Sequence, residues 1–130
     1  MNTPQITLTR RDVGRLDALL GNAVLERIGK VGEFLLDELT RAKIVPDDQV
    51  PPTLVTMNST VRFRDEESGR VNVVTLVYPQ DAAAREGAVS VLTPVGAALL
   101  GLSAGQSISY ETLDGRIKTL TVLEVLGHGA

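Results

Sequence analysis

The sequence predicts an α+β protein in which an N-terminal antiparallel helical hairpin precedes an antiparallel β-sheet with one short helix. Three observations support this fold class. Apolar residues recur at helical spacing before residue 45, a proline-rich segment follows, and β-rich runs separated by turn residues fill most of the remaining chain. Residues 89–102 interrupt those runs with a helical pattern, so we expect this stretch to lie at the centre of the C-terminal core.

The N-terminal part, residues 1–45, is expected to form two helices joined by a short turn. After an extended segment at residues 5–8, Thr9 and Asp12 have the spacing of a capping box and start the first helix. Gly21 and Asn22 are expected to end it. The second helix carries apolar residues at alternating steps of three and four, which is coiled-coil spacing: Val24, Ile28, Val31, Leu35, Leu39 and Ala42. The two helices therefore predict a short antiparallel coiled coil with arms of about 20–30 Å.

Residues 46–53 are expected to be a linker, because prolines and an Asp-Asp pair gather there. The C-terminal domain then covers residues 54–130. Its β-rich runs are 54–57, 61–64, 71–78, 107–112 and 117–126. The charged turn at 66–69 and the Asp114-Gly115 turn join neighbouring runs as hairpins, which indicates antiparallel pairing.

The stretch 89–102 is expected to be a buried strand that leads directly into a short helix. Thr93 offers a side-chain oxygen that caps the helix, and Pro94 occupies its first position, where a missing N–H costs no hydrogen bond. Val95, Leu99 and Leu102 then follow on one apolar face, on which we expect Leu99 to be almost fully buried.

Small residues shape the same helix. Gly96 and Ala97 allow another segment to approach one side of it closely. Gly101 is expected to end the helix in the left-handed conformation, which glycine adopts without a steric penalty.

Composition excludes several kinds of chemistry. The chain has no cysteine, so disulfides, thiolate metal sites and a cysteine nucleophile are excluded. His128 is the single histidine and is expected to lie in a solvated tail, which argues against a Ser-His-Asp arrangement. We therefore expect no catalytic residue, no metal and no other cofactor.

Charge and hydropathy limit which partners the chain can bind and where in the cell it is expected. The net charge is −3 at pH 7, so direct binding of nucleic acid through its phosphates is not expected. No apolar run approaches the ~18 residues of a membrane span, and residues 1–15 lack the apolar core of a signal peptide. A cytoplasmic location, without membrane contact, is the expectation.

The sequence resembles a known family at three separated motifs. Residues 91–101, which read VLTPVGAALLG, are similar to the signature of the C-terminal domain of the bacterial Gre transcript-cleavage factors, GreA and GreB. Together with residues 55–59 (VTMNS) and 75–79 (TLVYP), they more closely resemble the regulators of nucleoside diphosphate kinase, the Rnk family of short Gre homologues. The second resemblance spans nearly the whole chain.

This resemblance implies an FKBP-like C-terminal domain, an N-terminal coiled coil, and binding to RNA polymerase at the rim of its secondary channel. Gre factors hold a catalytic Mg²⁺ with acidic residues at the tip of their coiled coil, whereas the turn at residues 21–26 contains one carboxylate. The resemblance thus implies a non-catalytic regulator that competes with Gre factors and does not stimulate transcript cleavage. The expected polymerase contacts are Thr93, Pro94, Val95 and Gly96, and the coil-tip candidates are Asn22 and Glu26.

Two alternatives come from other functional classes. An FKBP-like fold also suits a peptidyl-prolyl isomerase, although the chain has no tryptophan and few aromatic residues to form the floor of its pocket. A structural homodimer built through exposed apolar residues of the coil, such as Phe34 or Leu36, is the other alternative. We expect a monomer. The sequence does not indicate how a nucleoside diphosphate kinase would be regulated.

Overall fold

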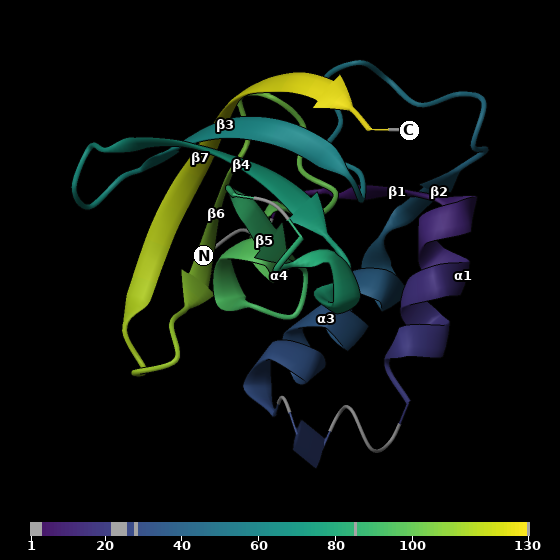
Figure 1. Ribbon diagram of the computed structural model, residues 1–130, viewed down its shortest axis with the longest axis horizontal. Coiled ribbons are helices and arrows are strands. Elements are labelled where there is room, and N and C mark those ends of the chain that lie inside the picture. Colours follow the sequence, from purple (N-terminus) through teal and green to yellow (C-terminus); the bar gives the residue numbers. More distant parts are fainter. Residues whose placement is uncertain (1–3, 22–25, 28, 85, 130) are drawn as a thin grey trace.

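The computed structural model describes residues 4–21, 26–27, 29–84 and 86–129 (Figure 1). Its elements are β1 (Thr7–Thr9), α1 (Arg10–Leu19), α3 (Lys30–Arg41), β2 (Lys43–Val45), β3 (Ser59–Asp65), β4 (Val71–Val77), the 3₁₀ helix η1 (Pro79–Asp81), β5 (Ala88–Ser90), α4 (Pro94–Leu99), β6 (Ser107–Glu111) and β7 (Ile117–His128). This composition confirms the predicted α+β class. Figure 1 shows a curled sheet over α4, with α1 and α3 beside them.

The N-terminal hairpin begins and ends in a small parallel sheet that the sequence analysis did not anticipate. β1 pairs with β2, so that Thr7 lies opposite Lys43 and Thr9 opposite Val45. Thr9 also caps α1, because its Oγ1 accepts a hydrogen bond from the Asp12 N–H at 3.1 Å. The capping prediction is confirmed, and the strand pair fixes both ends of the hairpin to each other.

The two hairpin helices are shorter than the sequence pattern predicts. α1 has 10 residues and α3 has 12, which correspond to about 15 and 18 Å. Gly29, with φ of 54°, is the N-cap of α3, and Ala42 is already extended, so the helix ends at Arg41. α1 packs against β1 and β2, and α3 packs against α4. Asn22, Val24 and Ile28, which belong to the expected turn and coiled-coil pattern, lie outside the described residues.

The C-terminal sheet is mixed rather than purely antiparallel. Its strand order is β5-β4-β3-β7-β6. The β3–β4, β3–β7 and β6–β7 pairs are antiparallel, as predicted, but β5 pairs with β4 in parallel. The expectation of an all-antiparallel sheet is wrong at this pair, because the connection through η1 brings the chain back beside Thr75, and β5 then runs alongside the last residues of β4 in the same direction.

Residues 54–57 were expected to be a strand, and this expectation is wrong. They form a buried segment whose backbone bonds to the end of α4: the Val55 N–H donates to the Leu102 carbonyl at 2.8 Å, and its own carbonyl accepts from the Gly101 N–H at 3.0 Å. The apolar run therefore reflects burial between elements, and β3 begins at Ser59.

The end of the chain also differs from the expectation. His128 is the last residue of β7, where it pairs with Ser59, and its Nε2 lies 2.7 Å from the Leu54 carbonyl oxygen. It is part of the sheet and not of a solvated tail. The hydrogen bond holds the end of β7 against the buried segment that precedes β3.

One continuous apolar core joins the hairpin to the sheet. It includes Ile6, Leu8, Leu16 and Leu35 from the first part of the chain and Val55, Leu76, Leu99 and Leu120 from the second, all of them fully buried or nearly so. The predicted burial of Leu99 is confirmed. Within the described part of the chain, no helix combines the length and apolar character needed to cross a membrane.

The hairpin is joined to the C-terminal part of the chain by two close contacts, which we call the seam. One is between Gly101 and residues 6–7, and the other is between Asp12 and Met57. Gly101 has φ of 82°, as predicted, and a Cβ atom there would lie 3.0 Å from the Cβ of Ile6. The Thr7 N–H donates to the Gly101 carbonyl at 3.0 Å. On α1, the buried carboxylate of Asp12 accepts from the Met57 N–H at 3.0 Å. Burial raises the pKa of Asp12, and the Met57 hydrogen bond opposes that rise.

Candidate functional site

The turn from β5 into α4, which we call the corner, is held by a small hydrogen-bond network. Thr93 Oγ1 accepts from the Gly96 N–H at 3.1 Å and donates to the Ser90 carbonyl at 2.7 Å. Ser90 Oγ in turn accepts from the Leu92 N–H at 3.0 Å. Pro94 occupies the first turn of the helix. The predicted cap and proline position are confirmed, and the result is a corner with little conformational freedom.

The four candidate contact residues differ in accessibility. Thr93 is exposed, and Pro94 and Val95 are half-buried, so these three offer side-chain surface to a partner. Gly96 is buried, and a Cβ atom at this position would lie 2.1 Å from the Ser90 carbonyl oxygen. Gly96 therefore lets the first turn of α4 approach β5, which shapes the corner without contributing a side chain to its surface.

Two clefts lie on either side of the corner. The first, of about 840 Å³, lies between α3 on one side and α4 with the β6–β7 turn on the other, and we call it the α3 cleft. The second, of about 660 Å³, lies over the sheet and includes Phe63 and Val74, and we call it the sheet cleft. Pro94, Tyr110 and Leu113 line both of them. The corner is thus the ridge between two adjoining hollows.

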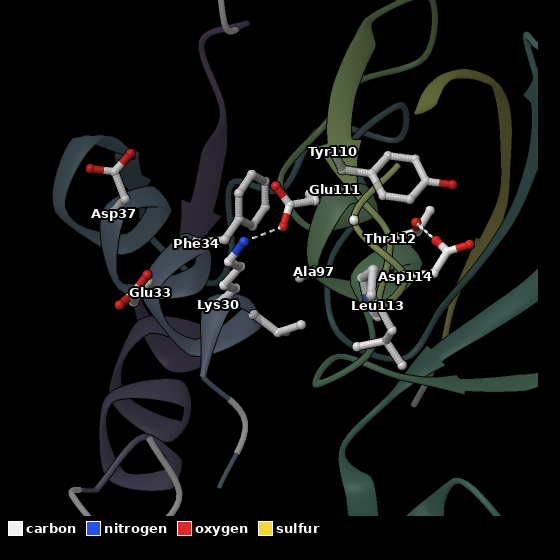
Figure 2. A pocket seen from close by; sticks show the side chains of 13 residues that line it. Lys30, Glu33, Phe34, Asp37, Ala97, Tyr110, Glu111, Thr112, Leu113 and Asp114 are labelled. Carbon is white, nitrogen blue, oxygen red and sulfur yellow. Dashed lines mark hydrogen bonds and ion pairs between the residues drawn. The ribbon is translucent and has the colours of Figure 1, made fainter. Parts of the chain in front are cut away.

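An ion pair joins the two walls of the α3 cleft (Figure 2). Lys30 Nζ, at the start of α3, lies 2.8 Å from Glu111 Oε2, at the end of β6. The hydrogen bond to Glu111 raises the pKa of Lys30. Figure 2 shows Phe34 on the α3 wall and Leu113 on the opposite wall. The cleft therefore combines an apolar interior with charged groups at its edges.

The rim of the sheet cleft is organised by a second ion pair. Lys118 Nζ lies 2.6 Å from Asp65 Oδ2, and both residues line the cleft. The hydrogen bond from Lys118 lowers the pKa of Asp65, and the same bond raises the pKa of Lys118. Burial raises the pKa of Tyr110, which lies between the two clefts. Near neutral pH, Asp65 therefore stays negatively charged and Lys118 positively charged, while Tyr110 stays neutral.

The tip of the hairpin is described only in part. Glu26 is exposed and helical, whereas Asn22 lies outside the described residues. Among residues 4–21, 26–27, 29–84 and 86–129, no three His, Cys, Asp or Glu side chains gather in a way that would hold a metal ion.

Neither cleft is predicted from the sequence. Phe34, Tyr110 and Leu113 come from segments far apart in the chain, and only the fold brings them together. Leu113 is a large apolar residue inside the polar turn 112–115, and the structure leaves it 86% exposed. At this exposure Leu113 contributes little to the core, and its side chain is available at the edge of both clefts.

Comparison with known families accounts for nearly the whole chain. The description "Transcription elongation factor, GreA/GreB, C-term" matches residues 50–126, and "Rnk N-terminus" matches residues 4–45. Together with the α+β fold, the larger match defines a chain of the GreA/GreB class of transcription factors. Within that class, the chain belongs to the Rnk family.

Individual relatives support this assignment. The chain is 40% identical over 125 residues to the "Regulator of nucleoside diphosphate kinase" of Escherichia coli K12. The aligned residues cover 96% of this chain and 91% of that protein. It is 37% identical to the transcription elongation factor GreA of Chloroflexus aurantiacus, over 84% of this chain and 67% of that protein. Among solved structures, a GreA/GreB elongation factor from Nitrosomonas europaea is 41% identical, with a TM-score of 0.70 over 94% of this chain and 98% of that one.

Proposed function

We propose that this Gre-like transcription regulator binds RNA polymerase at the rim of the secondary channel, where it competes with Gre factors without stimulating transcript cleavage. The observation that carries the proposal is the rigid, accessible corner at Thr93 and Pro94, which lies inside the region that matches the GreA/GreB C-terminal family. Because its hydrogen bonds and the fixed φ of proline already hold the corner in place, little conformational entropy is lost when a partner binds.

The proposed contacts follow from accessibility. Thr93, Pro94 and Val95 contact the polymerase, while Gly96 keeps the corner in shape. By the resemblance to Gre factors, Leu92 takes the place of an aspartate in their docking motif, so the contact would lack one carboxylate. Leu92 itself is half-buried. We therefore expect a shared site with different detailed contacts.

The lack of cleavage activity follows from the hairpin. A Mg²⁺ ion beside a reacting phosphate needs several oxygen ligands, usually from more than one carboxylate. Residues 21–26 supply one, that of Glu26, with Asn22 as the other coil-tip candidate. Helices of about 15 and 18 Å also give the hairpin a short reach. The proposal is that this hairpin, residues 1–45, acts as a short coiled coil that occupies space near the channel.

The rest of the architecture is proposed on the same basis. Residues 46–53 link the hairpin to a C-terminal unit, residues 54–130, in which a curled five-stranded sheet around α4 supports an FKBP-like arrangement (Figure 1). The chain acts as a monomer. An assay of peptidyl-prolyl isomerisation separates this proposal from the enzymatic alternative, because a docking protein should give no turnover above the spontaneous rate.

The direct test measures binding of the purified chain to core RNA polymerase, and then titrates the chain into a Gre-dependent cleavage reaction. Binding should be measurable, and cleavage should fall as the chain is added. The double variant Thr93→Ala/Pro94→Ala should weaken both effects about tenfold. Its matched control is Thr53→Ala/Pro52→Ala, an exposed proline–threonine pair in the linker.

Folding is controlled with Thr93→Ser, which keeps the capping oxygen and should bind like the parent chain. If saturating protein leaves Gre-dependent cleavage unchanged and no polymerase binding is detected, the shared site is wrong. If the purified chain, freed of Gre factors, stimulates transcript cleavage by backtracked polymerase, and Glu26→Ala abolishes this stimulation, the non-catalytic assignment is wrong.

A further inference from the structure

We infer that the α3 cleft is a second contact with the same partner, and that it takes a basic segment of RNA polymerase that carries a bulky apolar side chain. This inference rests on the proposed function, and it adds the hairpin helix α3 to a binding surface otherwise assigned to the corner. Three features of the cleft support it: its apolar interior, the charge of its rim, and its continuity with the corner.

The interior is suited to an apolar anchor. Phe34 and Leu113 lie on opposite walls of the cleft (Figure 2), and Pro94 and Ala97 also line it. Phe34 is half-buried against the core, while Leu113 remains 86% exposed. A partner side chain placed between Phe34 and Leu113 would remove both from water, which is the usual source of affinity at a small interface.

The rim selects a positively charged segment. Among the described residues that line the cleft, four carry carboxylates, Glu33, Asp37, Glu111 and Asp114, and one, Lys30, carries an ammonium group. Lys30 is already paired with Glu111, and Asp114 lies 3.5 Å from Arg116. In the part of the chain that the structure describes, no cation lies within ion-pair distance of Glu33 or Asp37. These two exposed carboxylates on α3 therefore attract lysine or arginine side chains of a partner.

The cleft is continuous with the corner. Pro94 lies on the ridge between the two clefts, and Tyr110 and Leu113 line both of them. A partner that contacts Thr93 and Pro94 is consequently next to the α3 cleft, and one protein segment can reach both. Because the cleft has one wall from the hairpin and one from the C-terminal unit, a segment bound there contacts both parts of the chain at once.

The test reverses the charge of the α3 wall and measures binding to core RNA polymerase at low and at moderate salt. Glu33→Lys/Asp37→Lys should weaken binding at low salt about tenfold and reduce its salt dependence, because the attraction that salt screens has been removed. The control is Asp17→Lys/Asp48→Lys, which makes the same change in net charge at exposed carboxylates outside the cleft. The control should bind within about twofold of the parent chain.

The apolar part is tested separately with Leu113→Ser. This side chain is almost fully exposed in the free chain, so the substitution leaves folding unchanged and a loss of binding reports the contact itself. If Thr93→Ala/Pro94→Ala weakens binding while the α3 and Leu113 variants match the control, the inference is wrong and the proposed function stands. If no variant and no parent chain binds polymerase, both fail together.

Discussion

Two of the places where the hairpin meets the C-terminal unit are built differently. At the seam, Asp12 accepts a buried hydrogen bond from the Met57 N–H, and the Thr7 N–H donates to Gly101. At the α3 cleft, the ion pair between Lys30 and Glu111 spans an open hollow, with the two side chains 80% and 36% exposed. The seam is therefore closed and the cleft is open, although both join the same two parts of the chain.

This difference indicates which contact fixes the hairpin and which one is available to a partner. A buried donor left without an acceptor is costly, so the seam bonds persist in the folded protein. An exposed ion pair contributes little, because water and salt screen it and both side chains lose freedom when they pair. We conclude that the seam sets the position of the hairpin, and that the Lys30–Glu111 pair can open at small cost when another molecule enters the cleft.

The largest expected effect comes from the core beneath both places. Leu99→Ala should lower the free energy of unfolding by about 2–5 kcal/mol, because the side chain is fully buried and its removal leaves a cavity. Denaturant unfolding followed by circular dichroism measures the change. A single transition for helix and sheet signals would show that the seam makes the two parts one cooperative unit. A loss below about 0.5 kcal/mol would mean that the helix face is wrongly assigned.

The next effect tests the close approach at the seam. Gly101→Ala should cost about 1–3 kcal/mol for its positive φ, with an added cost because the new Cβ would lie 3.0 Å from Ile6. Gly105→Ala is the matched control, since Gly105 has φ of 92° but no heavy atom within 4 Å of a Cβ there. The difference between the two variants in denaturant unfolding isolates the contact with Ile6 and with Thr7, the first residue of β1. Equal losses would show that β1 moves away freely.

The buried carboxylate of the seam gives a third effect. Asp12→Ala should destabilise the chain by about 1–3 kcal/mol, because the Met57 N–H is left without an acceptor. Asp12→Asn keeps a carbonyl oxygen in the same place and should cost less. Thermal unfolding of the two variants at neutral pH makes the comparison. Equal losses in both would mean that the charge of Asp12, and not the hydrogen bond, is what matters.

The raised pKa of Asp12, whose carboxylate accepts from the Met57 N–H, predicts how stability depends on pH. A carboxyl with a higher pKa in the folded state binds its proton more tightly there, so its contribution to stability is full below the unfolded pKa of 3.8 and falls as the pH rises through the folded value. Asp12→Asn has no carboxyl at this position to titrate, so its stability does not lose this contribution as the pH rises. Stability measured from pH 3.5 to 7 should therefore shift in favour of the variant as the pH rises, and a constant difference would contradict the raised pKa.

The sequence predicted local features well and features that depend on distant segments poorly. The corner was predicted in detail, because a threonine cap followed by proline is determined by neighbouring residues. The parallel β4–β5 pair, the position of His128 in the sheet and the buried segment 54–57 were not, since each depends on chain elements that meet only in the fold. The α3 cleft belongs to this second group, because its walls come from α3, α4 and the β6–β7 turn.

The smallest expected effect is on the ion pair across the open α3 cleft. Lys30→Ala removes the ion pair across the α3 cleft and should leave the thermal midpoint unchanged within error, because both partners are solvated. Lys118→Ala is the informative comparison, since the Lys118–Asp65 pair is more enclosed, with side chains 20% and 16% exposed, and its loss should lower the midpoint measurably. Scanning calorimetry of the three proteins, at low salt and again at high salt, gives the result. If Lys30→Ala lowers the midpoint as much as Gly101→Ala does, the α3 side holds the hairpin in place and the distinction between a closed seam and an open cleft is wrong.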